Sequence, residues 1–134
     1  MTIRICNQFS RLFLLLSLLV CLVSNPAVAQ EIDDAEAFFM LNALWFKAEG
    51  GAEKYQQYLQ AAGPLVSKHG GQNGDAYTPQ QSLIGEFDAD LVFLVEWPNF
   101  QAFTNLISDP DYQAISHLRE EAIDDSLLIR LKKL

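Results

Sequence analysis

Two stretches of the chain are apolar at almost every position, Phe38–Phe46 and Asp90–Trp97. The first is short, rich in aromatic residues and soon followed by the pair Gly50-Gly51, so the pattern predicts a buried strand rather than a helix. The second has the same character. Ser126–Leu134 instead alternates between apolar and polar residues, which is typical of an exposed edge strand.

Three other stretches carry apolar residues at steps of three and four, the spacing of one helical face. The first predicted helix runs from about Ala52 to Lys68, and we expect Gly63-Pro64 to kink it and Gly70-Gly71 to end it. The second follows the capping residue Asn99, and the third follows Asp109-Pro110, an acidic cap with proline at the first helical position. The inner faces of these two helices are Phe100, Phe103, Leu106 and Ile107, then Tyr112, Ile115, Leu118 and Ala122.

The segment between the first helix and the second apolar strand is polar over Gln72–Gln81. We expect a ragged strand and hairpin there, which Leu83–Phe87 completes. The order of elements is then β-α-β-β-α-α-β. This order predicts an α+β fold of the ferredoxin-like kind, a four-stranded antiparallel sheet with helices on one face.

The first predicted strand is apolar on both of its faces. Phe39, Leu41 and Trp45 alternate with side chains that are equally apolar, yet one layer of helices covers only one face of a sheet. Leaving three or four large apolar side chains in water forgoes about 1.5–3 kcal/mol each. We therefore expect a second copy of the chain to cover the open face, sheet against sheet, in a homodimer.

The N-terminal residues have the three parts of a secretory signal peptide. Arg4 and Arg11 precede an apolar run over residues 12–23, and Ala27-Val28-Ala29 follows. The run is too short for a transmembrane helix, which takes about 20 apolar residues. We expect cleavage after Ala29 and a periplasmic or extracellular protein; an uncleaved membrane anchor is the alternative. The predicted segments are a signal peptide (1–29), an acidic lead (30–36) and one folded domain (37–134).

Charge and cysteine content exclude several classes of function. The chain has 17 acidic and 9 basic residues, a net charge of −8, which repels nucleic acid phosphates. We expect no nucleic-acid partner, and no membrane partner after signal cleavage. Both cysteines, Cys6 and Cys21, lie in the signal segment, so the mature chain has no disulfide or thiolate nucleophile. The two histidines share no metal-binding motif, and neither a metal nor a cofactor is expected.

Three motifs lie on different predicted elements: Val95–Ala102 (VEWPNFQA), Ser108–Gln113 (SDPDYQ) with Arg119, and Lys68–Gly71 (KHGG). Together they resemble the family called domain of unknown function 1330, and the likeness spans most of the predicted domain. The resemblance implies the dimeric α/β-barrel superfamily, in which two ferredoxin-like protomers join sheet to sheet. It implies no particular chemistry, because none is settled for the family.

Haem-degrading members of that superfamily use an Asn on the first strand, a Trp on the helix after the third strand and a His on the next helix. This chain has Asn42 on its first strand, but Leu106 stands at the Trp position. His117 is one residue out of register with the His position, which falls near Ser116. The resemblance therefore disfavours haem degradation.

Asn42 is a polar residue in an apolar strand, and a buried amide needs partners or water. It is either a satisfied core amide, a residue of a hydrated dimer seam or a ligand contact. His117 is the candidate catalytic residue, because histidine is a common general base near neutral pH. His69 lies at the end of the first helix, where a cation complements the helix dipole.

Glu96 ends an apolar strand, and if buried it needs a partner such as Arg119, from the neighbouring helix or from the twin subunit. The two residues form either a structural ion pair or, in the alternative, part of a pocket with Glu96 as an acid. Aromatic residues are expected to line any cavity between the sheet and the first helix. The candidate ligand-binding residues are Asn42, Trp97, Tyr55, Arg119 and Glu96.

We expect an exported homodimeric α/β-barrel protein that binds a small apolar or aromatic molecule in a pocket of each protomer. One alternative is a cofactor-independent monooxygenase or isomerase with His117 as its base. The other is a non-catalytic structural or assembly module. A cavity of about 300 Å³ or more that holds polar groups favours binding or catalysis over the third class.

Overall fold

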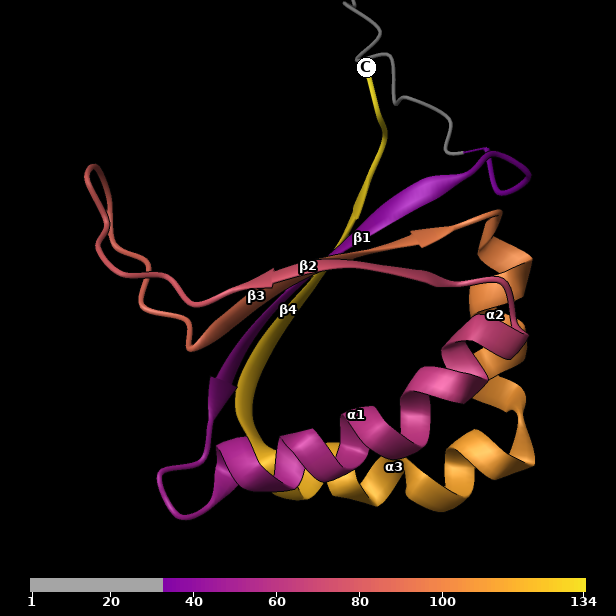
Figure 1. Ribbon diagram of the computed structural model, residues 1–134. Coiled ribbons are helices and arrows are strands. Elements are labelled where there is room, and N and C mark those ends of the chain that lie inside the picture. The colour runs from indigo at the N-terminus through magenta and orange to yellow at the C-terminus, as the bar shows by residue number, and fades with distance from the viewer. Residues whose placement is uncertain (1–32) are drawn as a thin grey trace, which may run out of the picture. The chain divides into compact units, whose positions relative to one another are not determined.

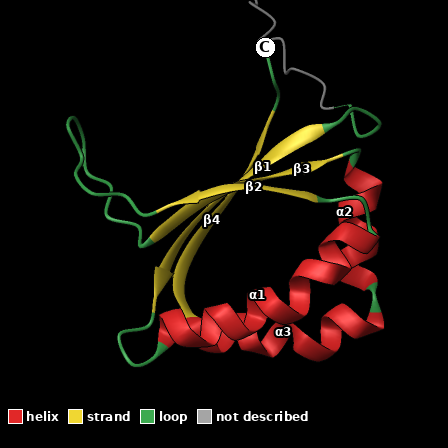
Figure 2. Ribbon diagram, in the orientation of Figure 1, coloured by secondary structure: helices red, strands yellow, loops and turns green. Residues whose placement is uncertain are grey.

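Four antiparallel strands form one sheet, and three helices lie against one of its faces (Figures 1 and 2). The computed structural model describes residues 33–134, so the predicted signal segment, with both cysteines, lies outside the described residues. The elements are β1 (Phe38–Phe46), α1 (Gly51–Lys68), β2 (Gln72–Tyr77), β3 (Leu91–Trp97), α2 (Phe100–Ser108), α3 (Pro110–Ala122) and β4 (Ile123–Leu131). The strand order β2-β3-β1-β4 confirms the predicted ferredoxin-like α+β fold.

The helix ends follow the capping residues that the sequence predicts. Asn99 Oδ1 accepts a hydrogen bond from the backbone N–H of Ala102 at 2.8 Å, which starts α2. Asp109 caps α3 in the same way, with Pro110 at the first helical position. The first helix continues through Pro64, and Figure 1 shows α1 changing direction in its second half. Gly70 follows that helix with φ +85°, a conformation that glycine adopts readily.

The predicted strand at Leu83–Phe87 is wrong. These residues lie in the loop between β2 and β3, where Ile84 is 98% exposed. β2 pairs directly with β3, and β3 already has β1 along its other edge. The outer edge of β2 is free, but Leu83 and Ile84 are 87% and 98% exposed, so burial of apolar surface does not stabilise a strand there. The loop returns to the sheet at Trp45, whose Nε1 donates a hydrogen bond to Asp88 Oδ1 at 2.7 Å.

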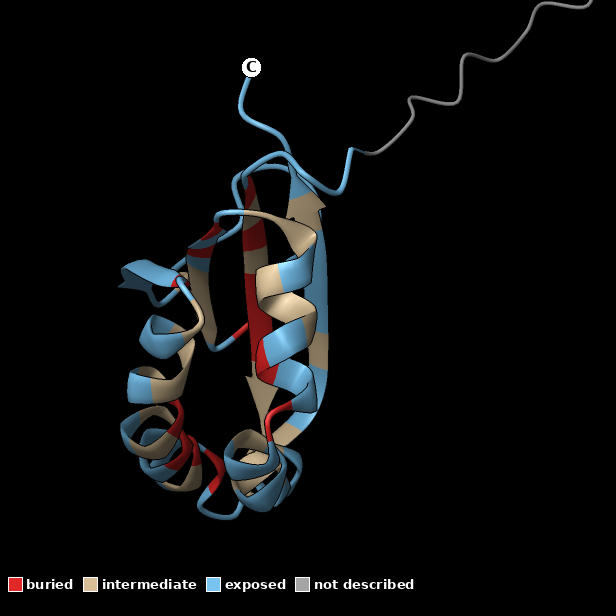
Figure 3. Ribbon diagram, turned by 90° about the vertical axis from the view of Figure 1, so that its right-hand side faces the viewer, coloured by how far each residue is buried: buried red, intermediate tan, exposed pale blue. Residues whose placement is uncertain are grey.

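The core on the helix-covered side of the sheet consists of two clusters, and Figure 3 shows buried positions on the central strand and on the facing sides of helices. One cluster joins the ends of β1 and β3 to α2, and the other joins β1 to α1 and α3. The buried members of the first are Phe38, Met40, Val95, Trp97 and Leu106; those of the second are Leu44, Tyr55, Tyr58, Ala62 and Ala122. The side chains on β1 alternate between faces as predicted.

The opposite face of the sheet has no covering element among residues 33–134. Leu41 of β1 lies opposite Leu94 of β3 and Ile129 of β4, so three apolar side chains form a row across the sheet. Leu94 and Ile129 are both more than a third exposed. This open face is apolar, as the sequence predicts. Within the described part of the chain, no helix combines the length and apolar character needed to cross a membrane.

Candidate functional site

A cavity of about 430 Å³ lies between the helix-covered face of the sheet and the three helices. This volume is in the range of small-molecule binding sites. Its wall is mostly apolar and is contributed by all three helices and all four strands. Exposed lining residues lie on the two edge strands, such as Gly74 on β2 and Leu128 on β4, so the cavity reaches solvent at the sheet edges.

Asn42 brings an amide into this cavity from the middle of β1. Its side chain is 8% exposed, and its Nδ2 donates a hydrogen bond to the carbonyl oxygen of Met40 at 3.1 Å. The bond uses one of the two amide hydrogens. Asn42 is thus a core amide with one of its hydrogen bonds made, and it also lies in the cavity wall.

Three tyrosines form the part of the wall between α1 and α3. The hydroxyl oxygens of Tyr58 and Tyr112 lie 2.9 Å apart in one hydrogen bond, and the rings of Tyr55 and Tyr58 stack at a centroid distance of 5.4 Å. Burial raises the pKa of Tyr55 and of Tyr58 well above that of free tyrosine. Both phenols therefore stay protonated at neutral pH. The sequence pattern assigned Tyr55 to the cavity and missed the bond between Tyr58 and Tyr112.

Arg119 extends from α3 into the same region, and its Nη2 is fully buried without a hydrogen-bond partner. The guanidinium is always charged in proteins. Within one protomer, no ion pair joins Arg119 to Glu96 among the described residues. Glu96 is exposed on the open face of the sheet, because it follows Val95, whose side chain points to the helices. Glu96 is consequently not a residue of this cavity.

Trp97 ends β3 and lies in the cavity wall, as predicted. It packs edge to face on Phe103 of α2, with ring centroids 5.5 Å apart. Its indole Nε1 is buried and has no hydrogen-bond partner. Together with Arg119 Nη2, it makes two unpartnered donors in the wall of a mostly apolar cavity.

His117 is exposed on α3 and does not line the cavity. Residues two apart on an α-helix point about 200° apart, so a helix that directs Arg119 inward directs His117 toward solvent. The expectation that His117 acts as a base in this cavity is therefore wrong in its placement. Tyr112 and Arg119 lie on the face of α3 that is directed toward the cavity. They are seven residues apart, and this spacing in the sequence indicates that they share one face of the helix.

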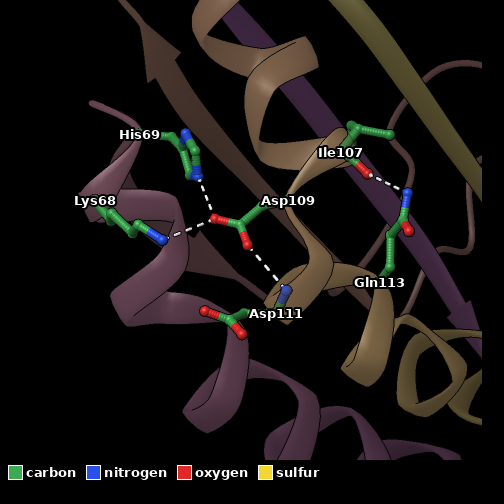
Figure 4. A network of polar contacts seen from close by, with 6 residues as sticks. All are labelled: Lys68, His69, Ile107, Asp109, Asp111 and Gln113. Carbon is green, nitrogen blue, oxygen red and sulfur yellow. Dashed lines mark hydrogen bonds and ion pairs between the residues drawn. The ribbon is translucent and has the colours of Figure 1, made fainter.

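A second polar group of residues joins the end of α1 to the start of α3 (Figure 4). Asp109 Oδ2 lies 2.9 Å from Lys68 Nζ and 2.8 Å from His69 Nε2, while its Oδ1 accepts the Asp111 N–H at 2.9 Å. The hydrogen bonds from His69, Lys68 and Asp111 hold the pKa of Asp109 well below its usual range. The sequence predicted the cap and the helix-end position of His69, and the structure adds the contact between them. These residues lie outside the cavity wall and fix two helices.

Metal binding has no support in the described part of the chain. No three side chains of His, Cys, Asp or Glu gather there as a metal site requires.

Comparisons with known proteins agree with this fold. The model of the domain of unknown function DUF1330 matches residues 49–130. No curated protein matches the chain. The crystal structure of RPA0582, a protein of unknown function from Rhodopseudomonas palustris, is 33% identical and covers 75% of this chain and 84% of its own, with a TM-score of 0.69.

Two more distant structures are similar in fold alone. A dimeric ferredoxin-like protein of unknown function from Jannaschia sp. CCS1 is 14% identical, covering 72% of this chain and 99% of its own, with a TM-score of 0.57. SnoaB, a cofactor-independent oxygenase from Streptomyces nogalater, is 12% identical, covering 75% of this chain and 95% of its own, with a TM-score of 0.54. The chain thus has the architecture of ferredoxin-like proteins that include dimers and an enzyme.

Proposed function

The chain belongs to the DUF1330 family, and from this premise we propose that it is an exported homodimer that binds a small apolar or aromatic molecule in a pocket of each protomer. One observation carries the binding proposal: a cavity of about 430 Å³ has an apolar wall with a few polar groups in it. That combination is typical of small-molecule sites. A purely structural module has no need of such a cavity, because close packing is more stable.

Export and self-association are the other two parts of the proposal, and residues outside the cavity wall support both. The pattern of residues 1–29 supports export. The test is to measure the mass of the mature protein and compare it with the mass expected for cleavage after Ala29. The open apolar face, with Leu41 between Leu94 and Ile129, supports self-association. A protein of the same fold is described as dimeric.

A cofactor-independent oxygenase is the second candidate, since SnoaB, with this fold, is such an enzyme. The groups in the cavity wall favour binding over base catalysis. Among the described residues that line it, the ionisable side chains are those of Arg119 and three tyrosines, and no His, Asp or Glu is present. Neither a guanidinium nor a phenol is a ready base at neutral pH, because an ordinary phenol is protonated there.

Filling the cavity from one position tests the binding proposal. Gly63 of α1 lines the cavity, and a Cβ added there meets no atom within 4 Å. Gly63→Leu should therefore fold normally and abolish the thermal shift that a panel of small aromatic molecules produces. Gln60→Leu is the matched control, because Gln60 lies on the same helix and faces solvent. Equal shifts in both variants would place binding outside the cavity.

A further inference from the structure

The guanidinium of Arg119 is a charge without a counter-charge. Its Nη2 is buried without a hydrogen-bond partner, and no ion pair of the described residues includes it. The nearest acidic neighbours on its helix are directed elsewhere: Glu121 pairs with Lys54 at 3.3 Å, and Glu120 is exposed. A half-buried cation with a buried, unpaired donor is costly, and this cost falls if a bound anion pairs with it.

The groups around Arg119 do not supply the missing negative charge. Tyr55 and Tyr58 have pKa values raised by burial, so they remain neutral although the positive charge of Arg119 opposes that rise. Tyr58 and Tyr112 share one hydrogen bond, which uses one of their two hydroxyl hydrogens. The second hydrogen is left to bond another acceptor. This end of the cavity therefore offers a cation and a hydroxyl donor.

We propose that the molecule bound in this cavity carries an anionic group, a carboxylate or similar oxyanion, that pairs with Arg119. This inference rests on the proposed binding function and names the chemical class of the ligand. The apolar wall receives the rest of the molecule, an aromatic or aliphatic body. Trp97, in the other core cluster, has an unpartnered Nε1 that can donate to a second acceptor on that body.

Two acid and amide pairs test the inference: 2-naphthoate with 2-naphthamide, and decanoate with decanamide. Binding to residues 30–134, which contain the whole described fold, is measured by titration calorimetry at pH 7. Charge-assisted hydrogen bonds are stronger than neutral ones, so at least one acid should bind about tenfold or more tightly than its amide. Arg119→Met should remove this preference by weakening acid binding far more than amide binding, because a neutral amide oxygen accepts a weaker hydrogen bond than a carboxylate. Arg119→Lys should retain most of the preference.

Arg130→Met is the control for the loss of one positive charge, because Arg130 pairs with Asp34 and is not in the cavity wall. It should keep the acid preference of the parent. Amides that bind the parent as tightly as their acids overturn this inference and leave the proposed pocket standing. An acid preference that survives in Arg119→Met also overturns it. If neither acids nor amides bind the parent, both this inference and the binding proposal fail.

Discussion

The hydroxyl oxygens of Tyr58 and Tyr112 lie 2.9 Å apart, which links α1 to α3 at the wall of the cavity. The two residues are 54 positions apart in the chain, and their rings meet edge to face at a centroid distance of 6.4 Å. This contact holds the two helices together where they stand away from the sheet. It uses one of the two hydroxyl hydrogens and leaves the other free for a further acceptor.

Tyr112→Phe removes this hydrogen bond and leaves the ring in place. The Tyr58 hydroxyl then loses its partner in a partly buried site, so the free energy of unfolding should fall by about 1 kcal/mol. Urea denaturation measures this change. Tyr77→Phe is the control, because Tyr77 is exposed and its hydroxyl makes only a 3.5 Å contact with Asp75. A loss of the same size in both variants would show that the bond between the helices contributes nothing specific.

Arg119→Met should raise the stability of the ligand-free protein. The substitution replaces a half-buried cation that has an unpartnered Nη2 with an apolar side chain of similar length. Relief of an unsatisfied buried group is worth about 1–3 kcal/mol, so the melting temperature should rise. Calorimetry of the protein, freed of ligand by refolding and dialysis, measures the change. A melting temperature lowered by several degrees would mean that the guanidinium has a stabilising partner in the ligand-free protein.

The sequence predicts the fold far better than it predicts the site. Apolar runs locate β1 and β3 because short, continuous apolar stretches are typical of sheet strands. Leu83–Phe87 resembles a strand in composition, but Leu83 and Ile84 are 87% and 98% exposed, so no burial of apolar surface stabilises a strand there. A local pattern does not report whether such packing is present.

The site residues illustrate the same limit. The alternation of a strand or the periodicity of a helix places four of the predicted residues on the inner face, where they line the cavity: Asn42, Tyr55, Trp97 and Arg119. His117 does not line the cavity. It was a candidate because of the chemistry of histidine and not because of its position on the helix. The partners of Arg119 and Tyr58 depend on how elements distant in sequence pack together, so they become visible only in the structure.

Asp109 makes the stability depend on acid pH. Its pKa is held well below the ordinary value of 3.8 in the folded protein, chiefly by His69 and Lys68. A carboxylate with a lowered folded-state pKa stabilises the protein fully above its unfolded pKa, and this contribution declines progressively as the pH falls from the unfolded pKa through the lower folded-state pKa. Asp109→Asn should therefore be less stable than the parent at pH 7, and the difference should shrink as the pH drops below about 4.

Denaturation of the parent and Asp109→Asn at pH 7, 5 and 3 gives this difference directly. Asp124→Asn is the control, a change at an exposed position on β4. Its effect should stay small at every pH. A difference between Asp109→Asn and the parent that is the same at pH 7 and pH 3 would contradict the contribution of the ionised carboxylate.

Ile129 and Leu128 are neighbours on β4 that point to opposite faces of the sheet, and they are similarly exposed, at 41% and 47%. If a second copy covers the open face, Ile129→Lys places a charge in the dimer interface, and the protein should sediment as a monomer at micromolar concentration. Leu128 points to the helix side, so the Leu128→Lys variant should remain dimeric. Sedimentation equilibrium compares the two. A monomeric parent, or two variants that both remain dimeric, would show that this face does not join two copies.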